Sequence, residues 1–191
     1  LTTGLNDGSS WANAFQGSGG LQAALTTAVA GDDIYVSEGS YLPAATLSRT
    51  VAFKLKNGVA VYGSFLGTES SPAQRPPFGT APSVLSGDLA GDDGLAMFGD
   101  NSFHIVTAPS TNATAVLDGF VISSGAATGA TGNQDRGGGI ICVGVAGPTV
   151  RNCRFVGNRC TYGGAAGYVA TLGGPTFTDC SFEGGVSDFT G

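Results

Sequence analysis

The segment Gly147-Pro148-Thr149-Val150-Arg151-Asn152-Cys153-Arg154-Phe155 returns 27 residues later as Gly174-Pro175-Thr176-Phe177-Thr178-Asp179-Cys180-Ser181-Phe182, with five of nine residues identical. In both copies the spacing of the apolar residues is typical of short strands with one buried face. A related segment lies 33 residues before the first copy, with Leu117 at the place of Val150 and Ile122 at the place of Phe155. Such self-similarity is the signature of a repeat architecture. The clearest repeats are therefore expected over residues 116–191.

Other apolar segments extend this pattern toward the N-terminus. The first series continues at intervals of about two dozen residues, so we expect about six coils; its earlier members are Ile34 to Val36, Val59 to Tyr62 and Ser83 to Leu85. A second series falls between members of the first, at Phe103 to Thr107, Gly139 to Val143 and Ala165 to Val169. Glycines at 137–139 and 163–164 precede two of these strands. They are predicted to form corners, where a positive φ or a close backbone approach is required.

Short strands at this period favour a solenoid, because one coil cannot bury its apolar face without its neighbours. We therefore expect an all-β fold, a parallel β-helix that forms a single domain over 1–191. A β-sandwich is the structural alternative, but its hairpins should show Asn-Gly or Asp-Gly turns between strands. Asp118-Gly119 instead lies inside a strand copy, which favours the solenoid.

One helix is predicted near residues 20–29. Its apolar residues have the spacing of one helical face, and Gly31 stands just beyond the expected end; they are Leu21, Ala24, Leu25, Ala28 and Val29. A helix at this point can cover the first coil and its open strand edges. We expect it to be a short N-terminal cap.

The composition excludes several classes of protein. Hydrophobic residues make up 41% of the 191 residues, which argues against disorder, and charged residues only 12%, so little of the surface carries charge. The net charge is -6 and the eight Lys and Arg residues are scattered, which disfavours binding to nucleic acid. No run approaches the roughly 18 apolar residues of a membrane span. We therefore expect no nucleic-acid partner and no membrane span.

The chain resembles a known group of proteins over nearly its whole length. The resemblance lies in Gly4-Leu5-Asn6-Asp7-Gly8-Ser9-Ser10-Trp11-Ala12-Asn13-Ala14-Phe15, Leu21-Gln22-Ala23-Ala24-Leu25, Gly31-Asp32-Asp33-Ile34-Tyr35-Val36 and Gly39-Ser40-Tyr41-Leu42-Pro43. It is extended over nearly the whole chain by Val61-Tyr62-Gly63-Ser64-Phe65-Leu66-Gly67-Thr68-Glu69, Leu85-Ser86-Gly87-Asp88, Asp100-Asn101-Ser102-Phe103-His104 and Leu117-Asp118-Gly119-Phe120. The chain is similar to bacterial extracellular right-handed β-helix repeat proteins of the pectate-lyase-like superfamily.

This resemblance implies a right-handed parallel β-helix that is exported, with its signal peptide removed, to the cell surface or the extracellular space. It implies little about activity, because many members of the group are surface proteins with no established reaction. Relatives usually carry one further strand before the segment at Gly4 and continue through more coils. We therefore expect both ends of the solenoid to be uncapped.

The densest acidic cluster is the best candidate for a metal site. Asp88, Asp92, Asp93 and Asp100 lie in the glycine-rich loop over 86–100. Calcium favours several carboxylate and carbonyl oxygens on a flexible loop, so calcium is the expected ion. The spacing departs from the EF-hand pattern, and a solvated loop that binds no ion is the alternative.

The four cysteines allow two disulfides. Cys142, Cys153, Cys160 and Cys180 show no C-x-x-C spacing, so a zinc site is not expected. Cys153 and Cys180 occupy equivalent repeat positions, and adjacent strands lie about 4.8 Å apart, within the range that a disulfide tolerates. Cys142 and Cys160 would form a second bridge. Buried free thiols acting as small apolar residues are the alternative.

No catalytic residues stand out. His104 is the only histidine, so a site with two histidines is excluded, and we expect it to pack or to bond to the backbone. Asp118, Arg151 and Asp179 are expected on the outer face, as solvated groups. The sequence therefore favours a protein that is not an enzyme.

Two functional hypotheses follow. The first is a non-catalytic extracellular structural protein, a subunit of a filament, sheath or adhesive surface layer that self-associates head to tail and contacts surface glycans. The second is a fragment of a carbohydrate-active β-helix enzyme, either a polysaccharide lyase or a hydrolase. Such enzymes need paired carboxylates or a calcium site with a basic group. A groove that contains Asp118, Asp135, Arg136 and Arg151 together would favour the second hypothesis.

Overall fold

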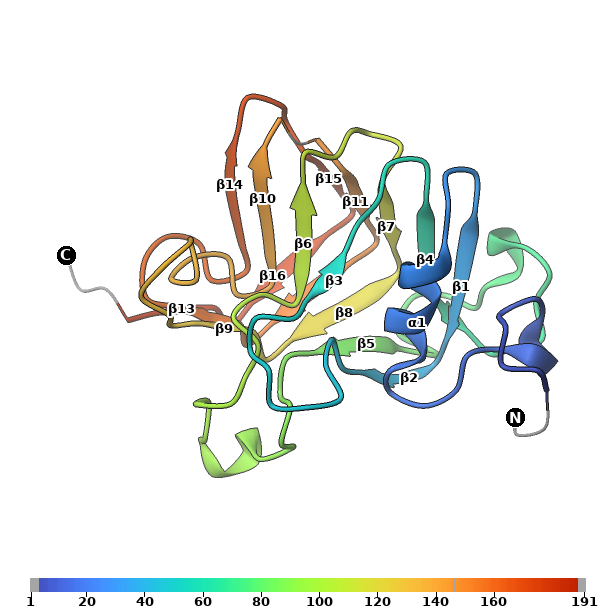
Figure 1. Cartoon of the computed structure of the whole chain (residues 1–191), viewed down its shortest axis with the longest axis horizontal. Helices are drawn as coiled ribbons and strands as arrows, with labels where there is room; N and C mark the ends of the chain where they lie inside the picture. Colours follow the sequence, from blue (N-terminus) through green and yellow to red (C-terminus); the bar gives the residue numbers. More distant parts are fainter. Residues whose placement is uncertain (1–3, 146, 189–191) are drawn as a thin grey trace.

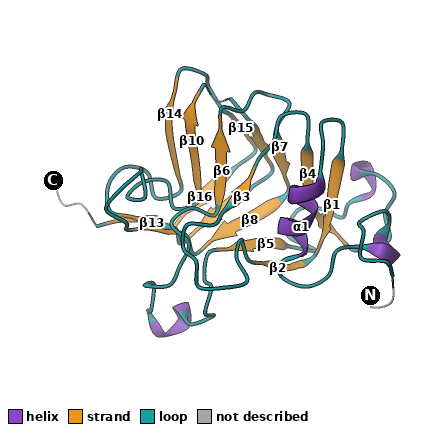
Figure 2. Cartoon of the chain, in the orientation of Figure 1, coloured by secondary structure: helices purple, strands orange, loops and turns teal. Residues whose placement is uncertain are grey.

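The computed structural model describes residues 4–145 and 147–188 (Figure 1). The last three residues of the predicted repeat region lie outside them, as do Leu1 to Thr3. The described chain is mostly β, with one α-helix, α1 (Gly20–Thr27), and three 3-10 helices (Figure 2); these are η1 (Trp11–Asn13), η2 (Pro72–Gln74) and η3 (Asp93–Leu95). None of these helices has the length and apolar character needed to cross a membrane.

The strands form four parallel sheets. The first sheet contains, in spatial order, β1 (Asp33–Ser37), β4 (Ala60–Phe65), β7 (Val116–Asp118), β11 (Thr149–Arg151) and β15 (Thr176–Thr178). The second contains β2 (Gly39–Tyr41), β5 (Ser83–Ser86), β8 (Phe120–Ser123), β12 (Arg154–Val156) and β16 (Ser181–Glu183). The third contains β3 (Phe53–Lys54), β6 (Val106–Pro109), β10 (Ile140–Gly144) and β14 (Gly167–Thr171). The fourth contains β9 (Ala126–Ala127), β13 (Arg159–Cys160) and β17 (Val186–Ser187).

The predicted repeat register is confirmed. The two 27-residue copies lie side by side, and the copy 33 residues earlier lies on the other side. The aligned residues are Val150 with Phe177 and Leu117, and Phe155 with Phe182 and Ile122. The second series is also confirmed, because β6, β10 and β14 are neighbours in one sheet. Parallel pairing of the described strands rules out the β-sandwich, whose sheets are antiparallel.

One member of the predicted first series was wrong. Ser83 to Leu85 belongs to β5, which pairs with β2 and β8 in the second sheet. A long loop that contains η2 separates β4 from β5, so the interval before Ser83 measured this loop and not a repeat. The two largest sheets contain five strands each. The described residues therefore hold five repeats, where the sequence intervals predicted about six.

The core lies between the sheets and consists of the inward side chains of successive strands. In the first sheet these include Val61, Leu117 and Val150, and in the second Ile122 and Phe155, all buried. Each strand is too short to form a core of its own, so burial comes from stacking along the sheets. The alternation of apolar and polar residues along each strand thus places the apolar side chains in the core.

Corner positions explain two polar residues that occupy equivalent places in the repeat. Where the chain passes from the first sheet to the second, Asn152 and Asp179 have φ of 51° and 52°. Asn and Asp tolerate this left-handed conformation better than other residues with a side chain. The predicted glycine corner is also confirmed: Gly137 has φ of 66°, and a Cβ at Gly138 would lie 2.3 Å from the carbonyl oxygen of Arg159.

The predicted helix is present as α1, which buries Leu21 and Leu25 against the core. It packs against β1 and β3 (Figure 1). Lys56 Nζ donates to the carbonyl oxygens of Thr26 and Ala28 at its C-terminal end, where a cation is favoured. Val29 lies beyond the helix and is 65% exposed, so the buried face is one residue shorter than predicted.

Candidate functional site

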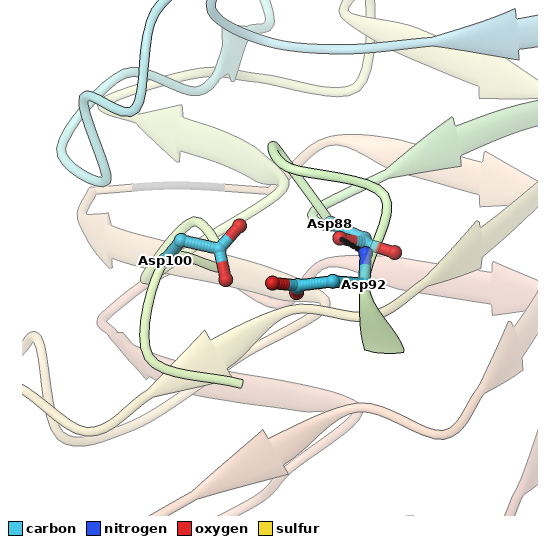
Figure 3. Close-up of side chains that lie close together, drawn as sticks. All are labelled: Asp88, Asp92 and Asp100. Carbon is cyan, nitrogen blue, oxygen red and sulfur yellow. Dashed lines mark hydrogen bonds between the residues drawn. The ribbon is translucent and has the colours of Figure 1, made fainter. Parts of the chain in front are cut away.

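Three of the four predicted calcium ligands lie together on the loop between β5 and β6 (Figure 3). Carboxylate oxygens of Asp88, Asp92 and Asp100 lie within 4.8 Å of one another, and all three residues are half-buried. Asp93 is not part of this group. Its carboxylate instead accepts a hydrogen bond from Asn101 Nδ2 at 3.0 Å.

Backbone N–H groups hold two of these carboxylates in place. Asp88 Oδ1 accepts from Gly91 N at 2.7 Å and from Asp92 N at 3.1 Å. Asp100 Oδ2 accepts from Ala90 N at 2.8 Å. These bonds fold the glycine-rich loop back on itself, which brings residues four to twelve positions apart into one cluster.

Asp92 is the least satisfied member of the cluster. Its Oδ1 atom is buried and accepts no hydrogen bond from the described residues. Burial and the neighbouring charges of Asp100 and Asp88 raise the pKa of the Asp92 carboxyl. Three crowded carboxylates of this kind suit either a shared proton or a cation with oxygen ligands. Calcium at this loop stays a prediction.

All four cysteines are free thiols in the structure. Cys153 and Cys180 lie at the predicted equivalent positions, and a hydrogen bond between their side chains lowers the pKa of Cys180 to about 7. Burial raises the pKa of Cys153. A disulfide between them stays a prediction.

The second predicted pair is separated in the fold. Cys142 lies in β10 of the third sheet, and burial raises its pKa to about 11. Cys160 lies in β13 of the fourth sheet, where its Sγ donates to the carbonyl oxygen of Gly163 at 2.8 Å. The two thiols thus have different surroundings, and each is buried as the alternative expected.

Asp118 is not a solvated outer residue, contrary to expectation. Its side chain is 3% exposed and forms ion pairs with Arg75 Nη2 at 3.2 Å and Arg151 Nε at 2.7 Å. Asn152 Nδ2 donates a further hydrogen bond at 3.0 Å. Arg75 comes from the loop after β4, and Phe78 of the same loop lines a small cavity of about 180 Å³ beside the cluster. The loop covers the strand and turns an outward carboxylate into a buried one.

Arg75 was missed by sequence reasoning because nothing near it marks it as functional. It lies 43 residues from Asp118, in a loop with no repeat signal. Besides Asp118, it donates to the carbonyl oxygen of Gly63 at 3.1 Å. These contacts fix the loop on the first sheet. Arg75 therefore has a structural role, and its guanidinium is engaged in hydrogen bonds.

The four residues that would favour an enzyme do not form one groove. Asp118 and Arg151 pair with each other, whereas Asp135 pairs with Arg136 at 3.4 Å. Arg136 Nη1 also donates to the hydroxyl of Tyr168 at 3.0 Å. Within the described residues, no hydrogen bond or ion pair joins the Asp118–Arg151 pair to the Asp135–Arg136 pair.

The remaining single residues behave as structural groups. His104 Nδ1 lies 3.0 Å from the carbonyl oxygen of Gly137, which confirms the expected backbone hydrogen bond. Burial lowers the pKa of His104. Asp179, the other predicted outer carboxylate, is exposed at the corner before β16.

A second feature lies at the C-terminal end. We call β14, β15, β16 and β17 the C-terminal row, because each is the last strand of its sheet. Phe182 of this row stacks on the buried Phe155 with ring centroids 5.0 Å apart, yet it is 54% exposed. It was predicted to lie inside the core. It is exposed because no described strand lies over it.

The chain was compared with models of protein families, with curated proteins and with solved structures, and none of them matches it. The structure shows a mostly β chain of parallel strands, with an acidic loop and an apolar C-terminal row. The resemblance noted in the sequence is carried forward as a proposal.

Proposed function

We propose that the chain is a right-handed parallel β-helix and a non-catalytic structural module of an extracellular layer or filament, whose copies associate end to end. The chain visits its sheets in the same order and returns to each one strand further along, which supports a β-helix. Connections between parallel strands of one sheet are almost always right-handed. The location outside the cell rests on the resemblance to extracellular β-helix repeat proteins.

The observation that carries the proposal is the C-terminal row. Phe177 and Phe182 form an aromatic group with Phe155, with ring centroids 5.0 to 6.3 Å apart. Val169 of the same row, which aligns with the buried Cys142, is also exposed. Apolar side chains at core positions of a repeat are normally covered by the next repeat. An exposed row of this kind can be covered by further strands, and this supports the proposal.

Covering this row would release a substantial free energy. Burying a large apolar side chain is worth about 1.5 to 3 kcal/mol, and the row offers several that are half-exposed. Its strands also present one edge of backbone N–H and C=O groups, which pair readily with another chain. A contact between two different ends is heterologous, and such contacts grow into filaments when they do not close a ring.

Charge opposes this contact at low ionic strength. The C-terminal row region carries Asp179, Glu183 and Asp188, and the last two are paired with Arg154 and Arg159. The opposite end of the molecule carries exposed acidic groups as well; they include Asp7, Asp32 and Asp33. Like charges at the two ends repel, and salt screens that repulsion. Association should therefore increase with salt.

Sedimentation and light scattering over a concentration series test the proposal. We expect the unmodified chain to form oligomers that grow with protein concentration and with ionic strength. Phe182→Asp should stay monomeric, because it places a charge on the apolar row. Val145→Asp is the matched control, since Val145 is also exposed but lies in the loop between β10 and β11. A chain that stays monomeric at every concentration and ionic strength would refute end-to-end association.

A further inference from the structure

A groove runs along β1 at the end of the molecule opposite the C-terminal row. It has a volume of about 630 Å³ and lies between β1, α1 and the N-terminal segment that contains η1. Leu21 and Ala24 of α1 line one side, and Trp11 lines the other. The volume is in the range of pockets that hold a ligand.

The groove follows the edge of β1 and not one of its faces. Its lining includes Ile34 and Val36, which turn toward the core, and also Asp33, Tyr35 and Ser37, which turn the other way. Successive residues of a strand point to opposite faces. A cavity lined by both sets must therefore wrap around the strand's edge.

The backbone of β1 has free hydrogen-bonding groups on this edge. Among the described strands, β4 is its one neighbour. Ala60 N donates to Asp32 O at 3.2 Å, and Glu38 N donates to Phe65 O at 2.8 Å. Asp32 and Glu38 flank β1, and their bonds show that the backbone N–H and C=O groups of the even-numbered residues face β4. Since the ladder alternates, the N–H and C=O groups of Asp33 and Tyr35 point into the groove.

The charged groups that line the groove are all acidic: Asp7, Asp32, Asp33 and Glu69. Hydrogen bonds from Ser9 lower the pKa of Asp7. The Glu69 carboxylate accepts three backbone hydrogen bonds from its own loop, which outweigh its burial and lower its pKa. The groove therefore stays negative at neutral pH and disfavours an acidic ligand.

We propose that this groove binds an extended, basic peptide segment of a partner protein, which adds as a strand beside β1. Strand addition uses the free backbone groups of Asp33 and Tyr35, and Lys or Arg side chains of the peptide face the acidic wall. The five residues of β1 span about 17 Å at 3.3 Å per residue. Trp11, Tyr35 and Tyr41 supply aromatic surface for the peptide's apolar side chains.

A second copy of the chain fits the groove less well. Its free strand in the first sheet is β15, which is neutral and is followed by Asp179. A strand without basic side chains gains nothing from the acidic wall, and Asp179 would be repelled. A bound basic peptide would also occupy the N-terminal end. Peptide binding and end-to-end association should therefore exclude each other.

Fluorescence of Trp11 tests the proposal, because it is the one tryptophan of the chain and lines the groove. The probes are synthetic peptides matched in length: alternating Lys and Val, alternating Glu and Val, and the Lys peptide N-methylated at alternate residues. Phe182→Asp is used as the host protein, so that end-to-end association does not interfere. We expect the Lys peptide to bind at least about tenfold more tightly than the Glu peptide, and N-methylation to abolish binding.

Variants and amide exchange locate the peptide. Asp33→Asn should weaken the Lys peptide about threefold or more, whereas Asp179→Asn, an exposed acid at the other end, should leave its affinity unchanged. The amide proton of Tyr35 should become protected from exchange on binding. Equal binding of the Lys and Glu peptides, full binding of the N-methylated peptide, or the same fluorescence change with a neutral glucose oligosaccharide would overturn the proposal. None of these outcomes depends on whether the chain forms filaments.

Discussion

Replacing Phe155 with alanine tests the stacking of the repeats most directly. Phe155 is fully buried, and Ile122 and Phe182 lie beside it on the neighbouring strands. Its ring stacks on that of Phe182 and meets that of Phe177 edge-on. The substitution removes a whole phenyl ring from the core and leaves a cavity, since short strands on both sides hold the backbone in place.

The expected loss of unfolding free energy is about 3 to 5 kcal/mol. Phe182→Ala makes the same chemical change one repeat later, where 54% of the side chain is already exposed. About half of the transfer free energy of the side chain is at stake there, so we expect a loss of about 0.7 to 1.5 kcal/mol. The two side chains occupy equivalent repeat positions, so the expected difference comes from their burial.

Equilibrium unfolding in urea measures both losses, at a protein concentration low enough to keep the chain monomeric. Coincident transitions by fluorescence and circular dichroism should first establish two-state behaviour. A loss under about 1 kcal/mol for Phe155→Ala, or equal losses for the two variants, would contradict the predicted core.

Three further predictions concern the polar groups. If the acidic loop binds calcium, millimolar calcium should raise the melting temperature by mass action, and an unchanged melting curve in chelator and in calcium would remove the site. Asp92→Asn should abolish that response. It should also raise the stability in chelator at neutral pH, because the folded-state pKa of Asp92 is raised. The stabilising contribution of Asp92 therefore exists at low pH and is lost as pH rises through that pKa. Asp118→Ala should cost about 2 to 3 kcal/mol in urea unfolding, since it strands two arginines that are partly exposed, whereas Arg154→Ala, which breaks an exposed pair, should cost under about 1 kcal/mol. Cys180 should be alkylated by iodoacetamide faster than the three buried thiols, with a rate that rises with pH through about 7; mass spectrometry that finds Cys142 modified first would contradict this order.

Local sequence patterns predicted the strands and their register because parallel pairing depends on properties that each repeat carries in itself. Val150 and Phe155 return as Phe177 and Phe182, and a parallel ladder places equivalent residues side by side. Ser83 to Leu85 misled for the same reason. The loop between β4 and β5 made the interval between these two strands close to that of a repeat, and spacing alone does not distinguish an inserted loop from a further repeat.

Among the candidate sites, too, some features could be predicted from local sequence and others could not. The acidic loop was predictable, since Asp88, Asp92 and Asp100 lie close in sequence and short backbone hydrogen bonds fold them together. The exposure of Phe182 was not, because the repeat pattern marks a core position whether or not another strand covers it.

The order of apolar and polar residues determined by itself that this chain forms short strands, that equivalent strands pair in parallel, and that one helix precedes them. Tertiary structure alone decided that Asp118 is buried between Arg75 and Arg151, and that β1 has a groove with an acidic lining along its free edge. Strand pairing follows a periodic signal that every repeat contains. The position of a loop depends on contacts between residues dozens of positions apart, and no local pattern in the sequence records which strand such a loop will cover.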